Sequence, residues 1–247
     1  MDFVELHFHL LPGVDDGPRT MDESLELARA AVADGTTTVV TTPHVHPDFI
    51  TNPAEIAGRV GELTQQLRAA DIDLEVLPGG ELAYEMVGRL GPVELDHIAQ
   101  GPPGRRWILL EGTLTGLDPD FTVAADRLRS WGFGVVVAHP ERARQTTDTA
   151  AALDHELARG SVVQLTAGSL WGLNGEMAQA TAMRLLRSWP SCAIASDAHG
   201  VTRPPGMRLA AGAMAAAGIR DPARFLSAGP RALLELGLSN SAVVSAV

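Results

Sequence analysis

The sequence predicts an α/β fold, a single-domain distorted (β/α)7 barrel of the TIM type, and three observations lead to this prediction. Short apolar runs alternate with longer amphipathic segments from one end of the chain to the other. Most of these runs are almost continuously hydrophobic, as parallel strands buried on both faces are. The length of 247 residues matches one barrel of about 250 residues. Periodicity cannot show whether a sheet closes, so a doubly wound open sheet is the alternative.

The elements follow in order along the chain. The predicted strands are rich in Val, Ile and Leu and lie at residues 3–7, 37–42, 74–78, 107–111, 134–139, 162–166 and 193–197. Amphipathic segments between them predict helices at 21–34, 53–70, 121–131, 147–159 and 176–189. Thr20 and Glu23 have the spacing of a capping box at the start of the first helix. Because no repeat, low-complexity run or linker divides the chain, residues 1–247 are predicted to form one domain.

Composition excludes several kinds of chemistry. All 19 basic residues are arginine, which excludes a Schiff-base lysine, a P-loop lysine and a carbamylated lysine that bridges metals. The single Cys192 excludes an internal disulfide and a cysteine-based zinc site. A thiol phosphatase needs an arginine six residues after its cysteine, and Ala198 stands there.

The charge and the apolar pattern indicate where the protein acts. A net charge of −11 argues against nucleic acid as a partner, because nucleic-acid-binding proteins usually present a basic face. No basic stretch followed by an apolar run opens the chain, and no apolar run approaches the roughly 20 residues of a membrane span. We therefore expect a cytoplasmic protein without membrane insertion; its oligomeric state stays open.

Histidines and carboxylates stand at the ends of six of the seven predicted strands. They are His7, His9, Asp16, His44, Glu81, Glu111, His139, Asp197 and His199. The carboxyl ends of barrel strands converge on one face, where barrel active sites form. Imidazole binds divalent transition metals well, and carboxylates can bridge two of them. Four ionised carboxylates crowded together would be destabilising without cations, so the sequence predicts two or three divalent metal ions at this face.

The order of these residues resembles the polymerase and histidinol phosphatase (PHP) superfamily, and within it the bacterial CpsB-like capsule and exopolysaccharide tyrosine phosphatases. The matching stretches are His7-Phe8-His9, Asp15-Asp16-Gly17, Thr42-Pro43-His44, Gly80-Glu81, Glu111, Ala138-His139-Pro140-Glu141-Arg142, Thr166-Ala167-Gly168-Ser169-Leu170, Ala195-Ser196-Asp197-Ala198-His199 and Arg203-Pro204-Pro205. They follow one another in order along most of the chain.

The resemblance implies a seven-stranded barrel with a trinuclear metal site held by the nine residues above. It also implies that Arg142 and Arg203 contact the substrate phosphate while metal-activated water attacks phosphorus. His139 and His199 are candidate catalytic histidines, and the proton donor to the leaving group is either a site histidine or a metal-bound water. Manganese is the metal we expect, with iron, zinc, cobalt or magnesium as alternatives. The implied partner is a phosphotyrosine-bearing protein, the tail of a bacterial tyrosine autokinase.

Three other functions remain open from the sequence. A small-molecule phosphatase of the histidinol-phosphatase type would use the same metals with a different pocket. A metal-dependent amidohydrolase also opens with His-x-His in a barrel, but several of these enzymes need the lysine that this chain lacks, and they typically end with a lone Asp rather than Asp-x-His. A metal-storing or regulatory barrel would need a broken ligand set, whereas here the set is intact.

Overall fold

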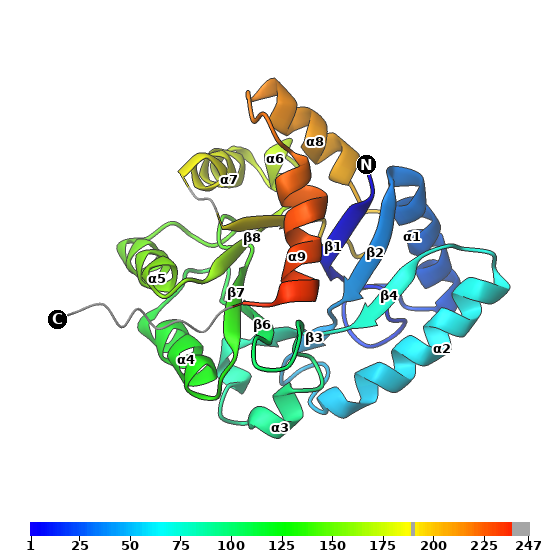
Figure 1. Cartoon of the computed structure of the whole chain (residues 1–247), viewed down its shortest axis with the longest axis horizontal. Helices are drawn as coiled ribbons and strands as arrows, with labels where there is room; N and C mark the ends of the chain where they lie inside the picture. The colour runs from blue at the N-terminus through cyan, green and yellow to red at the C-terminus, as the bar shows by residue number, and fades with distance from the viewer. Residues whose placement is uncertain (189–190, 239–247) are drawn as a thin grey trace.

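Parallel strands form the centre of the molecule, and helices surround them (Figure 1). The structure is a computed structural model that describes residues 1–188 and 191–238. Its strands are β1 (Phe3–Phe8), β2 (Thr36–Thr41), β3 (His44–Val45), β4 (Glu75–Pro78), β5 (Glu81–Ala83), β6 (Trp107–Glu111), β7 (Gly134–Ala138), β8 (Val162–Thr166) and β9 (Cys192–Ala195). Its α-helices are α1 (Met21–Asp34), α2 (Ile56–Ala69), α3 (Pro92–Leu95), α4 (Pro119–Ser130), α5 (Thr147–Ala158), α6 (Ala167–Leu170), α7 (Glu176–Ser188), α8 (Met207–Ala216) and α9 (Gly229–Leu236).

The strands form two parallel sheets, with the orders β1-β2-β4 and β3-β5-β6-β7-β8-β9. The second and third predicted strands, at 37–42 and 74–78, correspond to β2 and β4, which pair in the small sheet. Each is followed by a short strand that the sequence pattern does not predict, β3 or β5, and these two pair in the large sheet. Gly79 and Gly80 separate β4 from β5. A Cβ atom at Gly79 would lie 2.5 Å from the Val40 side chain, and one at Gly80 would lie 2.8 Å from that of Ile98. Glycine at both positions therefore leaves room for the packed side chains of Val40 and Ile98.

The first and last strands meet at their carboxyl ends. The amide of Asp197 donates to the carbonyl of His7 at 3.1 Å, and the amide of His9 donates to that of Ala198 at 3.0 Å. The predicted α/β fold of parallel strands is confirmed. The ladder hydrogen bonds group the strands into two sheets, and this contact beyond the end of β9 links the two.

Helix α9 covers the end of the strands opposite to the predicted site. Figure 1 shows it lying across the strands on the viewer's side. The indole N–H of Trp107, the first residue of β6, donates to the carbonyl of Leu233 at 2.9 Å. The side chains of Leu233 and Leu234 pack on an apolar cluster that includes Val4, Leu6 and Trp107. Because α9 closes the amino ends of the strands, the carboxyl ends remain available for a site.

Helix α1 has the boundaries that the sequence pattern predicts, and a side chain next to its first residue caps it. The Thr20 hydroxyl accepts a hydrogen bond from the Glu23 amide at 3.3 Å. The capping box is only half formed, because the Glu23 carboxylate accepts from the amide of Arg19 rather than from that of Thr20. Residue 189, the predicted end of α7, lies outside the described residues. Within the described residues no helix combines the length and apolar character needed to cross a bilayer.

Candidate metal centre

The structure brings all nine predicted side chains together at the carboxyl ends of the strands. They form four overlapping groups, in each of which the potential ligand atoms lie within 4.8 Å of one another. The groups are His9, Asp16, His44 and His199; His7, His139 and Asp197; His7, His9 and Glu81; and His44, Glu81 and Glu111. Residues separated by up to 192 positions in the chain therefore share one cluster, and their roles as ligands remain a prediction.

Strand pairing and backbone strain position these side chains. His44 and Glu81 are direct partners in the β3–β5 ladder, so the short strands that the sequence pattern missed hold two of the candidate ligands. His139 directly follows β7, and Asp197 lies two residues after the end of β9. Both have positive φ angles, of 31° and 54° respectively. Asp71 is the other described non-glycine residue with positive φ. Such conformations cost about 1–3 kcal/mol each and concentrate at functional sites.

Glu81 lies at the centre of the cluster. Its Oε2 atom is 3.1 Å from His7 Nε2, 3.3 Å from His9 Nε2 and 3.0 Å from His44 Nδ1. Its Oε1 atom pairs with His139 Nε2 at 2.9 Å. Glu81 is almost fully buried, so its charge faces imidazole nitrogens and not water.

The donor set fits divalent cations. Glu81 Oε2 and Asp197 Oδ1 are buried without a hydrogen-bond partner in the described structure, although imidazole nitrogens lie within 3.6 Å of both. Two ligand atoms that are each about 2.1 Å from a shared ion lie roughly 3.0–3.4 Å apart in octahedral or tetrahedral geometry. The 3.2 Å between the Nε2 atoms of His7 and His9 falls in this range. This spacing fits a shared ion as well as a hydrogen bond between the two nitrogens.

The charges in the cluster are strongly coupled. Burial raises the pKa of Glu81, but the charges of His7 and His44 outweigh burial and hold this pKa well below its usual value. Burial lowers the pKa of His9, but hydrogen bonds to Asp15 and Glu81 outweigh it and raise the pKa to about 9. Burial and the charge of His9 together lower the pKa of His199. Glu81 thus stays ionised, while the pKa values of His9 and His199 shift in opposite directions. A bound cation would take the place of protons on these histidines.

Two polar residues, Asp15 and Gln164, orient the candidate ligands, a role that the sequence pattern does not predict. Asp15 accepts from His9 Nδ1 at 2.8 Å and from the His44 amide at 3.1 Å. Gln164 Oε1 lies 2.9 Å from His7 Nδ1 and accepts from the His139 amide at 3.2 Å. Such partners fix the ring orientation of a metal-binding histidine. A sequence signal existed for Gln164, because it is the one amide side chain in the apolar strand β8.

Both predicted arginines reach the mouth of the cluster. Arg142 and Arg203 each donate to Oδ2 of Asp197, and Arg203 also lies 3.5 Å from Asp16 Oδ2. Their side chains are 18% and 32% exposed, whereas that of Asp197 is 1% exposed. The guanidinium groups therefore connect the buried cluster with solvent, where an anionic substrate would arrive.

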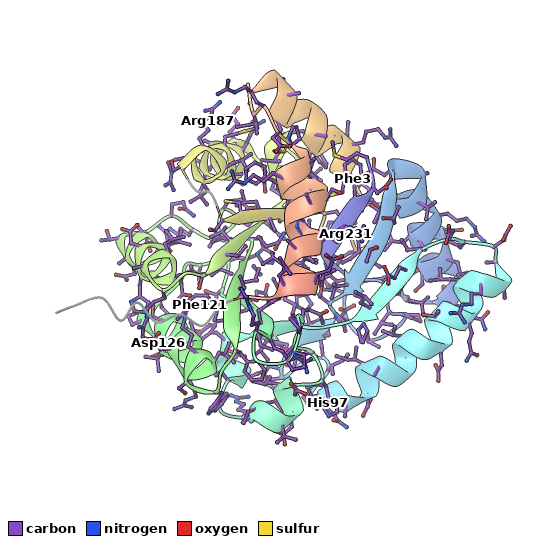
Figure 2. The ribbon with its side chains drawn as sticks, viewed as in Figure 1. Phe3, His97, Phe121, Asp126, Arg187 and Arg231 are labelled. Carbon is purple, nitrogen blue, oxygen red and sulfur yellow. The ribbon has the colours of Figure 1, made fainter. Side chains whose placement is uncertain are left out.

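The three remaining histidines lie outside the cluster. His155 pairs with Asp126 across α5 and α4, and His46 lies 3.5 Å from Glu85. His97 is exposed beside α3 at the rim of the molecule (Figure 2). Cys192 is buried in β9, and burial raises its pKa to about 12. Its thiol therefore does not ionise at neutral pH, in agreement with the exclusion of thiol chemistry.

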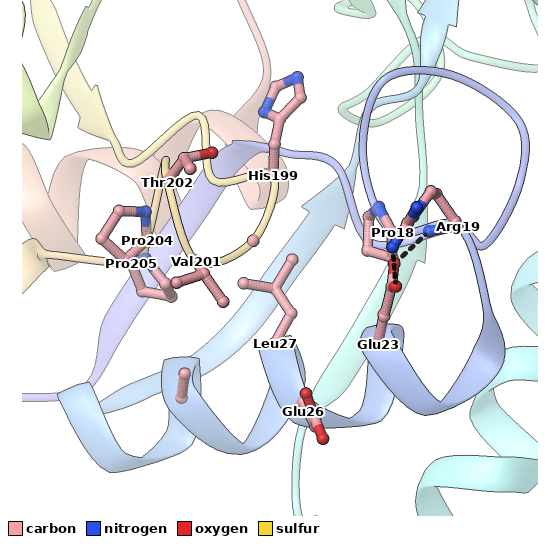
Figure 3. Close-up of a pocket in the computed structure, with 12 residues that line it drawn as sticks. Pro18, Arg19, Glu23, Glu26, Leu27, His199, Val201, Thr202, Pro204 and Pro205 are labelled. Atoms are coloured by element: carbon pink, nitrogen blue, oxygen red, sulfur yellow. Dashed lines mark hydrogen bonds and ion pairs between the residues drawn. The ribbon is translucent and has the colours of Figure 1, made fainter.

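A cavity of about 410 Å³ opens beside the cluster, between α1 and the loop that follows β9. Figure 3 shows Leu27 of α1 beside Val201 and Pro204 of this loop, with the ring of His199 directed away from these apolar side chains. Arg19 and Glu23 pair at one side of the cavity. Since His199 belongs both to the lining of the cavity and to the metal cluster, the cavity borders the candidate site.

Histidines and carboxylates clustered at the ends of parallel strands, with two arginines at the mouth, are the arrangement of a metal-dependent phosphoester hydrolase. Residues 3–228 match the family model described as capsular polysaccharide synthesis, CpsB/CapC. The chain belongs to the CpsB/CapC family.

Similar proteins carry the names of tyrosine phosphatases. The chain is 33% identical to the tyrosine-protein phosphatase YwqE of Bacillus subtilis over 202 residues, which cover 80% of this chain and 78% of YwqE. It is 27% identical to the putative tyrosine-protein phosphatase CapC of Staphylococcus aureus over 207 residues, which cover 83% of this chain and 80% of CapC.

Solved structures agree with the fold. A crystal structure from work on YwqE of B. subtilis and CpsB of Streptococcus pneumoniae, described as metal-dependent tyrosine phosphatases, superposes with a TM-score of 0.82 at 30% identity and covers 94% of both chains. An organophosphorus hydrolase from Deinococcus radiodurans, at 17% identity and a TM-score of 0.57 over 94% of this chain and 92% of its own, shares the fold alone.

Proposed function

We propose that this protein is a metal-dependent protein-tyrosine phosphatase. The observation that carries the proposal is the convergence of nine histidine and carboxylate side chains, with Glu81 at their centre, beside two arginines. The names of the related proteins support the same reaction. Manganese is the metal we propose, in two or three ions, and the PHP superfamily is the wider group in which we place the chain.

Each group of residues has its own role in the proposed phosphoester hydrolysis. The nine clustered side chains would hold divalent cations, which would supply an activated water and neutralise charge on the phosphoryl group. Arg142 and Arg203 hold the phosphate through planar, paired N–H donors. Asp15 and Gln164 keep His9 and His7 in fixed orientations. His139 or His199 is the candidate for protonating the tyrosyl oxygen, which needs less help than an alkyl oxygen because its pKa is about 10.

A protein substrate fits the surface better than a small molecule. The cavity of about 410 Å³ beside His199 is bordered largely by apolar side chains and offers room for residues that flank a phosphotyrosine. We propose the phosphorylated tail of a bacterial tyrosine autokinase as the partner. A small-molecule phosphatase of the histidinol-phosphatase type is the second candidate, because it would use the same cluster. Its substrate would not occupy this cavity, which is why we place it second.

The proposal also covers the barrel, the single domain and the location of the protein. We take the two sheets together as one distorted seven-stranded barrel, because hydrogen bonds join the end of β1 to the residues after β9. One domain over residues 1–247 and a cytoplasmic location stay predictions from the sequence.

Removal of the metal tests the proposal. Excess EDTA should abolish hydrolysis of a phosphotyrosyl peptide, and added Mn²⁺ should restore it. His139→Ala should lower kcat about a thousandfold, since several kcal/mol of transition-state stabilisation would be lost. His155→Ala, which changes a histidine outside the cluster, should leave kcat unchanged. Full activity in EDTA would refute the proposal, and faster turnover of histidinol phosphate or of an amide substrate would favour the alternatives.

A further inference from the structure

Phe49 is unusual among the aromatic residues of this chain. Within residues 1–188 and 191–238 it is the one exposed aromatic side chain, with 43% of its surface accessible. The other described Phe, Tyr and Trp side chains are buried or partly buried. Phe49 does not belong to either apolar core cluster, although its neighbour Ile50 packs against one of them. Core packing therefore does not account for a phenyl ring at this position.

The ring of Phe49 lies directly against the candidate metal centre. It stacks on the imidazole of His44, with the ring centroids 5.4 Å apart and the planes inclined by 19°. It also lies 5.9 Å from the ring of His46. His44 in turn lies 4.7 Å from His9 by ring centroids, so a continuous run of rings leads from the buried cluster to solvent at Phe49.

A tight turn holds Phe49 in this place. The amide of Phe49 donates to the carbonyl of His46 at 3.0 Å, and the amide of Ile50 donates to that of His44 at 3.3 Å. The amide of His46 returns a hydrogen bond to Ile50 at 3.1 Å. Phe49 also borders a hollow of about 260 Å³ together with Val14 and Ile50. The turn is thus fixed by backbone hydrogen bonds, and the phenyl ring lies beside an open space that polar side chains such as Asn52 and Arg59 also line.

We propose that Phe49 recognises the aromatic ring of the substrate and so makes the site selective for aryl phosphates. The inference rests on the proposed function, because it takes the phosphate to be held at the cluster. One oxygen atom separates the phosphorus of phosphotyrosine from its ring, so a phosphate between the cluster and the arginines places that ring near the rim. Phe49 supplies there a rigid apolar surface with which an aromatic ring can pack edge-to-face or offset.

A purely protective role for Phe49 makes a different prediction. If the ring only shielded His44 from water, its removal would weaken every phosphate ligand equally and would weaken metal binding. Ring recognition instead predicts a loss confined to aryl ligands, with metal affinity unchanged.

Phosphonate binding separates the two roles without requiring turnover. Calorimetry on the Mn²⁺-loaded protein would compare benzylphosphonate with propylphosphonate, which share the charged group and differ in the ring. The unmodified protein should bind the benzyl compound about three- to tenfold more tightly. Phe49→Ala should remove this preference, Phe49→Leu should keep a smaller part of it, and Mn²⁺ affinity should stay the same in both variants. Leu209→Ala, which removes an exposed apolar side chain on α8, should keep the full preference.

Two results would overturn the inference: a benzyl preference that survives in Phe49→Ala, or an equal loss for both phosphonates in that variant. Failure of the proposed function would look different. In that case no phosphoester would be hydrolysed by the unmodified protein, while the ring preference and its dependence on Phe49 would still be measured.

Discussion

The two carboxylate oxygens of Asp197 face different parts of the site. Its Oδ1 atom lies 3.3 Å from His7 Nε2 and 3.5 Å from His9 Nε2, whereas its Oδ2 atom accepts from both Arg142 and Arg203. Burial raises the pKa of Asp197, but the charges of His7 and His139 outweigh it and hold this pKa far below its usual range. One carboxylate therefore links the metal-facing side of the site to the phosphate-facing side.

Replacement of Arg142 tests the phosphate-facing side. Arg142→Ala should lower kcat/KM for a phosphotyrosyl peptide by about 10- to 100-fold, because a hydrogen bond to a charged group contributes about 1.5–3 kcal/mol. Arg142→Lys should recover only part of this loss, since the ammonium group keeps the charge and lacks the planar pair of donors. Steady-state kinetics would measure both effects. Arg187→Ala on α7 is the control, and an unchanged kcat/KM in Arg142→Ala would limit Arg142 to neutralising Asp197.

The sequence predicted that the candidate ligands lie together because their signal is local. Each of them stands at or just beyond the end of an apolar run, so the pattern alone placed them on one face. The supporting roles of Asp15 and Gln164 depend on contacts with residues up to 157 positions away, and no local pattern encodes such contacts. Phe49 was missed for the same reason, because its stacking on His44 and its exposure are properties of the folded turn.

At the scale of elements, the sequence located the strands better than their pairing. The runs at Trp107–Glu111 and Val162–Thr166 have the predicted bounds. The short strands β3 and β5, of two and three residues, are too short for periodicity to detect. Gly79 and Gly80 separate β5 from β4, at a place where a Cβ atom would clash with the side chains of Val40 and Ile98. These two glycines bring Glu81 into line with His44.

Helix α1 provides a test of the cavity beside His199. Ala30 lines this cavity and is exposed, so Ala30→Trp should fill the space without disturbing the core. We expect kcat/KM for a phosphotyrosyl peptide to fall at least about fivefold, equal to roughly 1 kcal/mol. Hydrolysis of p-nitrophenyl phosphate, which is too small to occupy the cavity from the cluster, should be unchanged.

Ala33 on the same helix supplies the matched control. It is exposed and does not line the cavity, so Ala33→Trp adds the same indole elsewhere on α1. If both variants hydrolyse the peptide at the unmodified rate, the cavity does not contact the substrate. If Ala30→Trp slows both substrates equally, the effect belongs to the cluster and not to peptide recognition.

At the scale of the whole molecule, the cluster brings together residues from both sheets. The candidate ligands come from or directly follow β1, β3, β5, β6, β7 and β9, which belong to both sheets. Two of these ligands, His139 and Asp197, have strained backbone conformations that surrounding interactions must stabilise. Bound ions would therefore act as cross-links between the two sheets as well as sites of chemistry.

This arrangement predicts that divalent cations stabilise the fold as well as activate it. At a free Mn²⁺ concentration about 100 times its Kd, binding should add about 2.7 kcal/mol to the free energy of unfolding. For a chain of this size the Tm should then rise by roughly 5–11 °C over the EDTA-treated protein. Thermal denaturation followed by circular dichroism measures the difference. His7→Ala, which removes a nitrogen shared by two of the four groups, should show a much smaller rise, whereas His155→Ala should show the full one. Equal Tm values in EDTA and in Mn²⁺ for the unmodified protein would mean that the nine side chains hold no ion, because a cation bound only to the folded state must raise its stability.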